Sequence, residues 1–143
     1  MGLYVDMRVD VRIPKDKQAD CLKAINMLHI ADVLKENAGG GSDNNPHYSW
    51  VNNPGVNGFP TLEDALYAWR YECKEVDGVL TIFAFIGEKW GDDEVLYKAL
   101  ASFAEDGSSI EVEGGGETWG YTYKNGVCVT QTAETKWKDG DPL

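Results

Sequence analysis

Cysteine and histidine are scarce in this 143-residue sequence. There are three cysteines, far apart along the chain, and two histidines. Disulfide frameworks and zinc sites need such residues in pairs at short spacing. We therefore expect no metal and no cofactor. The cysteines are expected to be small buried apolar side chains in a reducing compartment.

Long apolar runs and phosphate-binding loops are lacking as well. No run of about 18 apolar residues exists, and the N-terminus has no basic region followed by an apolar stretch. The glycines at 39–41 neither follow a strand pattern nor precede Gly-Lys-Ser, so they do not predict a nucleotide site. These absences predict a cytoplasmic protein that does not contact membranes.

Basic residues are few: 13 Lys and Arg stand against 24 Asp and Glu, for a net charge of −11. The excess is concentrated in 88–117, where nine acidic residues oppose two lysines and leave a net −7. The acidic residues are Glu88, Asp92, Asp93, Glu94, Glu105, Asp106, Glu111, Glu113 and Glu117. Such a field repels nucleic-acid phosphates and attracts basic surfaces. It predicts a protein partner with a basic surface and no direct binding of nucleic acid.

Helical periodicity occurs in three segments. Apolar residues recur every three or four positions in 15–34, 61–70 and a segment that runs from Asp92 or Asp93 to 104. Thr61 begins the second segment with a capping-box pattern. The acidic residues at the start of the third complement the helix dipole, which explains part of the acidic cluster without any partner.

Strand patterns fill most of the remaining chain. Two pairs are joined by Asp-Gly and Asn-Gly, the strongest short signals for a hairpin. The predicted strands are 5–13, 71–76, 79–86, 109–113, 117–123 and 127–132. With the helices, they predict one α+β domain over 1–143, built on a curved antiparallel sheet of five to six strands. Two to three helices would cover one face, in a split β-α-β arrangement like the ferredoxin-like fold.

The strand predicted at 79–86 is almost continuously apolar, which is typical of a central strand covered on both faces. Its second face would be covered either by the long loop or by another copy of the chain. The second alternative would make the protein a homodimer.

Residues 38–60 form a predicted loop rich in Gly, Asn and Pro, and 138–143 a fraying tail. Loops of this length are usually functional or disordered. His47, Tyr48 and Trp50 lie in the loop. These three side chains would either anchor the loop by packing or bind a small ligand such as a nucleotide.

No catalytic residues are predicted. His29 lies on the apolar side of a helix and is expected in the core, while Glu111 and Glu113 are expected to be surface acids rather than a glycosidase pair. Trp119, Tyr121 and Tyr123 share one strand face. They would belong either to the core or, if exposed, to an interface.

Short motifs between residues 85 and 126 carry a family resemblance. They are Gly87-Glu88-Lys89, Leu96, Ala99-Leu100-Ala101, Glu105-Asp106-Gly107-Ser108, Ile110-Glu111, Gly116-Glu117, Trp119 and Asn125-Gly126. On these residues the chain resembles small uncharacterised α+β proteins of phages and other mobile elements. Gly120 stands where such proteins have Arg beside the Trp. The resemblance implies a phage-like context and a host-cell cytoplasm, and no particular functional residue.

Acidity and resemblance together lead to the main hypothesis, a non-enzymatic anti-defence protein, comparable to an anti-CRISPR. It would block the basic, nucleic-acid-binding surface of a host protein. Its partner-binding residues would be Glu105, Asp106, Glu111, Glu113 and Glu117. The alternatives are a ligand-binding module that uses the 47–50 loop and an enzyme, for which no motif speaks.

Overall fold

The computed structural model describes residues 3–37, 54, 57–133 and 139–143. Within them, three helices and eight strands are defined, with a 3-10 turn at Lys15–Lys17. The strands are β1 Leu3–Tyr4, β2 Asp6–Ile13, β3 Tyr71–Val76, β4 Val79–Phe85, β5 Lys89–Trp90, β6 Ser109–Gly114, β7 Glu117–Lys124 and β8 Val127–Thr132. The helices are α1 Gln18–Asn37, α2 Leu62–Ala68 and α3 Asp93–Leu100.

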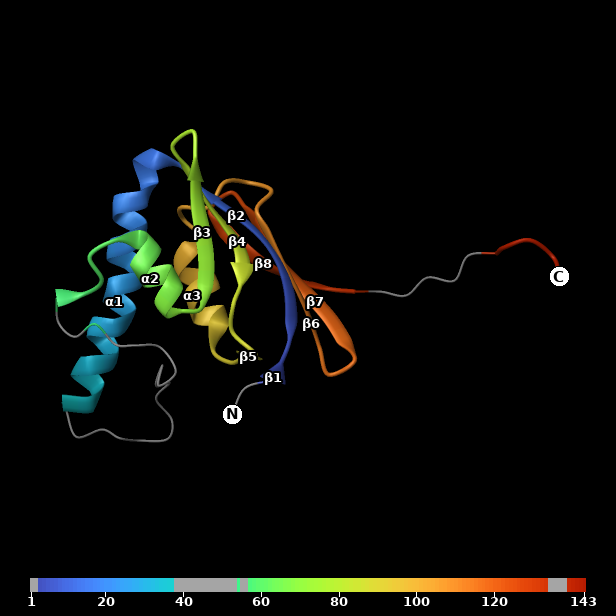
Figure 1. Cartoon of the computed structure of the whole chain (residues 1–143), viewed down its shortest axis with the longest axis horizontal. Helices are drawn as coiled ribbons and strands as arrows, with labels where there is room; N and C mark the ends of the chain where they lie inside the picture. Colours follow the sequence, from blue (N-terminus) through green and yellow to red (C-terminus); the bar gives the residue numbers. More distant parts are fainter. Residues whose placement is uncertain (1–2, 38–53, 55–56, 134–138) are drawn as a thin grey trace.

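Six strands form an antiparallel sheet in the order β3-β4-β2-β6-β7-β8. The parallel strands β2 and β3 are separated by β4, which is the split β-α-β arrangement, and the β7–β8 hairpin extends it on one side. All three helices lie against one face of this sheet and leave the other face open (Figure 1). The predicted α+β class, strand number and one-sided helix layer are confirmed.

Alternation along β2 places its residues on the two faces. Val9, Val11 and Ile13 are buried beneath the helices, while Asp6 and Asp10 are exposed on the open face. The core also contains Trp69, whose indole N–H donates to Nε2 of the fully buried His29 at 3.0 Å. His29 is therefore a core residue, as predicted.

The two predicted hairpins are confirmed. Asp77 and Asn125 have φ values of 53°, and the glycines after them have φ values of 82° and 76°. Two successive left-handed residues make the type I′ turn that matches strand twist, and Asn, Asp and Gly adopt it at the lowest cost.

Thr61 caps α2, as the capping-box pattern predicts. Its hydroxyl accepts a hydrogen bond from the backbone N–H of Asp64 at 3.0 Å. We expect Thr61→Ala to lower the free energy of unfolding by about 1 kcal/mol, because that N–H loses its partner. Chemical denaturation measures the loss. Thr61→Ser is the control: it keeps the hydroxyl, and a loss as large as that of Thr61→Ala would contradict the capping role.

Several local predictions are wrong. Residues 89–90, which lie outside the predicted strands, form β5 and pair with β1. Helix α1 runs to Asn37, and α3 ends at Leu100 rather than 104. In the single chain Phe83 of β4 is 42% exposed, and the cover of this second face by another copy of the chain stays a prediction. A bulge at Phe83 shifts the register with β3, so that Phe85 turns back toward the core and packs on Tyr71.

The aromatic stripe on β7 belongs to the core, one of the two alternatives. Tyr121 and Tyr123 are buried, and the half-buried Trp119 packs edge-on against Trp90. All three cysteines are free thiols, but only Cys21 is fully buried, whereas Cys73 and Cys128 are half-buried. Burial raises the pKa of Cys21 to about 12 and that of Cys73 to about 11. Both are therefore unreactive thiols at neutral pH.

The predicted loop falls largely outside the described residues, whereas the predicted tail is described except for residue 138. Of the predicted loop 38–60 only Pro54 and residues 57–60 are described, and residues 139–143 of the tail are exposed and belong to no element. In the part of the chain that is described, no helix has the length and apolar character needed to cross a membrane.

Candidate functional site

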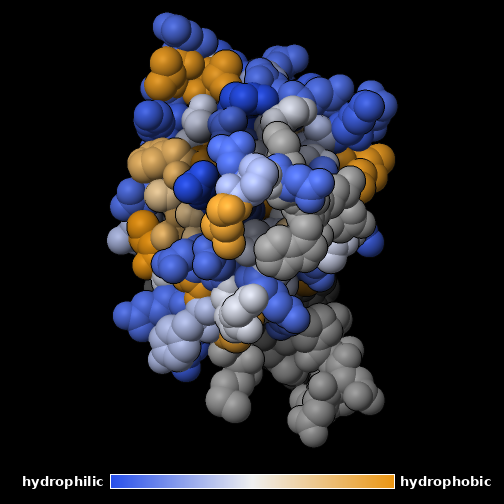
Figure 2. Space-filling model, turned by 90° about the vertical axis from the view of Figure 1, so that its right-hand side faces the viewer, coloured by the Kyte–Doolittle hydropathy of each residue, from blue (hydrophilic) through white to orange (hydrophobic). Residues whose placement is uncertain are grey.

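The open face of the sheet carries the charged residues of β2 and β6 in register. Arg8 lies opposite Glu111, Asp10 opposite Ser109 and Asp6 opposite Glu113. The four acidic residues in these pairs are exposed, and so is Arg8. The face is hydrophilic with separate apolar patches (Figure 2).

Glu105 and Asp106 lie at one end of this face and are engaged within the protein. The Arg12 guanidinium contacts Glu105 Oε1 and Asp10 Oδ2, each at 3.1 Å. Asp106 Oδ1 accepts from the backbone N–H of Asn125 at 2.9 Å, and its carbonyl accepts from Arg12 at 3.3 Å. These contacts tie the α3–β6 loop to β2 and to the β7–β8 turn. They also leave less negative charge free for a partner at this end.

At the other end of the face, Asp6 and Glu113 make none of the ion pairs defined among the described residues, although Arg8 lines a shallow hollow with them. Asp6 and Glu113 are direct cross-strand neighbours, and like charges in that position destabilise a sheet by a few tenths of a kcal/mol or more. Glu88 is held nearby by the bond from the Val5 N–H to its carbonyl, 3.2 Å long. Glu117 begins β7 opposite Gly114, next to Glu113. We call Asp6, Glu88, Glu113 and Glu117 the acidic end.

The two ends are separate surfaces. Glu113 follows Ser109 by four positions along β6, which at the usual strand rise places them about 14 Å apart. The five acidic residues expected to bind a partner are therefore not brought together. Glu113 and Glu117 lie at the acidic end, Glu111 faces Arg8, and Glu105 and Asp106 contact Arg12 and Asn125.

An open hollow of about 510 Å³ lies at the acidic end. Its walls are the segment from Tyr4 at the end of β1 to Asp6 at the start of β2, Gly87 and Glu88 after β4, and the stretch from Glu113 to Gly116. Gly114 permits a close approach there, because a Cβ at this position would lie 2.8 Å from the carbonyl oxygen of Tyr4. The turn can therefore sit directly against the N-terminal strand.

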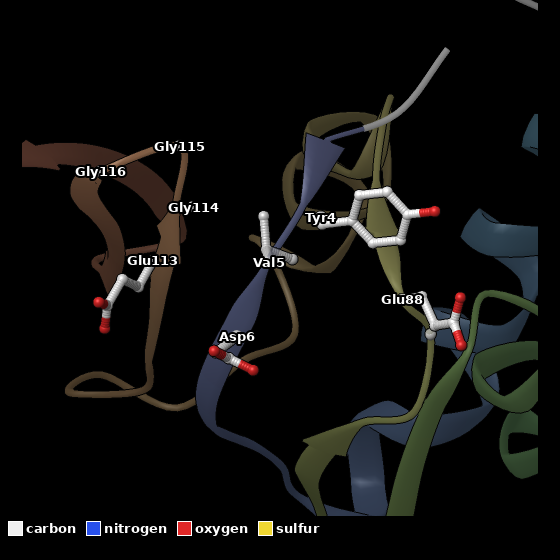
Figure 3. A pocket seen from close by; sticks show the side chains of 9 residues that line it. Tyr4, Val5, Asp6, Glu88, Glu113, Gly114, Gly115 and Gly116 are labelled. Atoms are coloured by element: carbon white, nitrogen blue, oxygen red, sulfur yellow. The ribbon is translucent and has the colours of Figure 1, made fainter.

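The carboxylates around this hollow come from three segments and do not converge on one point (Figure 3). Consistently, no group of three or more ligating side chains suited to a metal occurs among the described residues. One lysine, Lys89, lies close by, with its ammonium 5.0 Å from the Tyr4 ring. Spread, solvated carboxylates suit recognition of several cationic groups rather than coordination of one ion.

A second, buried set of polar groups lies behind the sheet. The Tyr71 hydroxyl donates to Asp93 Oδ2 at 2.7 Å. The hydroxyl oxygens of Tyr71 and Tyr97 are hydrogen-bonded at 2.7 Å. Trp90 donates to the Tyr97 hydroxyl at 3.1 Å, and Asp93 Oδ1 accepts from the Gly91 N–H at 2.9 Å. This network fixes the start of α3 against β3. The sequence places Asp93 at the start of a helix, but no pattern marks which of the three consecutive acids is buried.

The pKa values in this network follow from burial. Asp93 is 1% exposed, and desolvation raises its pKa, although the Gly91 N–H and the Tyr71 hydroxyl oppose the rise. Desolvation also raises the pKa of Tyr71 and of Tyr97, so both remain neutral hydroxyls at physiological pH. The carboxylate is closed off from solvent, so we assign the network to stability rather than to substrate chemistry.

The alternative ligand site at His47, Tyr48 and Trp50 lies outside the described residues and stays a prediction. An anionic ligand would need converging arginines. Arg70 lies beside Gly87 and acts on buried Asp93 from the helix side, whereas Arg8 and Arg12 belong to the open face. These arginines therefore do not form one anion site.

Compared with protein families, curated proteins and solved structures, the chain matches none. The resemblance to phage proteins in 85–126 accordingly remains a prediction.

Proposed function

We propose that the protein is a non-enzymatic interaction protein that binds a basic surface of another protein through its acidic end. The observation that carries the proposal is the like-charged pair Asp6–Glu113, exposed on the helix-free face, with the exposed Glu88 lining the same hollow and the exposed Glu117 at the adjoining β6–β7 turn. Its repulsion costs folding free energy. That cost would be relieved when cationic groups of a partner lie over the pair.

The net charge of −11 supports the same partner chemistry. A protein of this charge is drawn to surfaces that bind nucleic acid, because those surfaces are shaped and charged to receive phosphates. In the phage-like context, the partner would be a nucleic-acid-handling host defence protein, which the acidic end would inhibit by competing with the nucleic acid.

Salt dependence tests the proposal. Immobilised protein is exposed to host lysate at about 0.05 M and about 0.5 M salt, over which the Debye length falls from more than 10 Å to about 4 Å. We expect stoichiometric capture of a basic protein at low salt, loss of most of it at high salt, and competition by added DNA or RNA. Capture unaffected by salt and nucleic acid, or no capture at low salt, would contradict the proposal.

A further inference from the structure

The two edges of the six-stranded sheet differ in chemistry. Edge strand β3 carries Glu72, Lys74 and Glu75, and its register with β4 is interrupted by a bulge. Edge strand β8, Val127–Thr132, carries no charge and no proline, and four of its six residues are Val or Thr. Charges and bulges are the devices by which proteins prevent unwanted strand pairing. One edge is protected in this way and the other is not.

The register of the β7–β8 hairpin determines which backbone groups of β8 are unpaired. Lys124 and Val127 flank the two-residue turn as a hydrogen-bonded pair, so Cys128, Thr130 and Thr132 direct their N–H and C=O groups away from β7. The backbone hydrogen bonds of Tyr123, which lies opposite Cys128, agree with this register. The Tyr123 N–H donates to the Ser108 carbonyl, and the Tyr123 carbonyl accepts from the Gly107 N–H, both at 3.0 Å. The outer side of β8 thus presents a row of donors and acceptors to an incoming strand.

A groove of about 490 Å³ runs beside this edge, between β8 and α3. Tyr97, Tyr121 and Cys128 line it, and Ala101 and Ser102 contribute small side chains on the helix. Glu94 and Lys98, one helical turn apart on α3, also line it. An added strand would therefore find both backbone partners and a recess for its side chains.

Charge argues that the added strand comes from a second copy of the chain. From Thr118 to Ala133 there is no acidic residue, although the whole chain has a net charge of −11. A like-charged molecule can approach here with the least repulsion. A twofold axis would also place Glu94 of each copy beside Lys98 of the other, which is the self-complementary pattern that an isologous interface requires.

We propose that two copies pair their β8 edges antiparallel and form a homodimer with one continuous sheet. Helix α3 of each copy would lie beside α3 of the other over the joined groove, with Glu94 and Lys98 exchanging contacts across the axis. This interface differs from the one considered for the apolar strand at 79–86. It leaves the acidic ends of both copies exposed.

The test is the mass in solution. Sedimentation velocity and light scattering are measured from about 1 µM to about 500 µM, the range of weak to moderate association. We expect a shift from the 15.8 kDa chain to twice that mass, and a stronger dimer at higher salt because like charges are screened. This salt response is opposite to that expected for the basic partner, so the two proposals can fail separately. A monomer over the whole range would overturn the dimer.

Proline substitutions locate the interface. Thr130→Pro removes an outward-facing N–H without touching the pairs with β7, and we expect it to weaken dimerisation at least tenfold. Glu75→Pro is the matched control: Glu75 is opposite Leu80, next to the pair that flanks the other two-residue turn, so its N–H faces solvent at the β3 edge. It should leave the dimer intact. Equal effects of the two prolines would contradict pairing through β8.

A charge exchange gives an independent answer if Thr130→Pro does not fold. Glu94→Lys and Lys98→Glu should each weaken the dimer, and the double variant should restore it. The Tyr121 hydroxyl donates to Glu94 at 2.6 Å, a bond that the double variant also lacks, so recovery cannot come from it. A double variant no better than the single ones would overturn the proposed twofold contact. Thermal melts of all variants report whether each is folded.

Discussion

Removing the four carboxylates of the acidic end should slow association with the basic partner by roughly 10- to 10³-fold. The variant combines Asp6→Asn, Glu88→Gln, Glu113→Gln and Glu117→Gln. Uncompensated surface charge acts mainly on the rate of encounter, so the dissociation rate should change less. Surface plasmon resonance with the captured partner measures both rates, and the salt dependence of the variant should be shallower than that of the parent protein.

The control removes four carboxylates elsewhere, so that net charge is equal in the two variants. Glu63→Gln, Glu72→Gln, Glu75→Gln and Asp77→Asn change exposed residues of α2, of β3 and of its turn. This control should retain most of the association rate. If both variants lost the same amount, total charge rather than the acidic end would be responsible, and the proposed binding surface would be wrong.

Stability gives the acidic-end variant a second readout. Because Asp6 and Glu113 repel each other across two strands, their neutralisation should raise the free energy of unfolding by about 0.2–1 kcal/mol. Loss of binding together with a gain in stability is the behaviour of residues kept for a partner. A destabilised variant would instead indicate that these carboxylates support the fold.

Asp93→Ala should cost about 2–4 kcal/mol of unfolding free energy, or roughly 6–12 °C in melting temperature. The substitution leaves the half-buried Gly91 N–H without its acceptor and takes one partner from the buried Tyr71 hydroxyl. Asp93→Asn is the matched variant, since it keeps an acceptor oxygen and removes the buried charge. At neutral pH it should lose less than half as much as Asp93→Ala, measured by calorimetry or urea denaturation.

The difference in stability between the parent protein and Asp93→Asn should depend on pH with a definite sign. Burial raises the pKa of Asp93 above 3.8, so between 3.8 and the raised value the folded protein binds more protons than the unfolded chain. The stability that protonated Asp93 contributes is present below pH 3.8 and is lost as pH rises through the folded pKa. The stability of the parent protein minus that of Asp93→Asn should therefore fall as pH rises above 3.8. A difference that is constant with pH would contradict the burial of an ionisable carboxyl.

Local sequence patterns predicted the six-stranded sheet and its helices because most of these elements have a strong period or turn signal. The strict alternation of 5–13, the Asp-Gly and Asn-Gly turns and the capping Thr61 all act over a few residues, and each is found where it was expected. The return of Phe85 to the core was missed because one bulge residue inverts the alternation, and no sequence signal marks the bulge. Strand β5 was missed because two residues hold no periodicity; its pairing with β1 joins residues more than eighty positions apart.

The sequence by itself determined the α+β class, the two hairpins, the core position of His29 and the excess of negative charge. Only the tertiary structure decided where that charge acts. Nine acidic residues close together in the chain are distributed by strand register and helix placement to a buried network at Asp93, an ion pair at Glu105 and an exposed repulsive pair at Glu113. Register depends on contacts between distant segments, and shifting it by one residue would reverse which carboxylates face solvent.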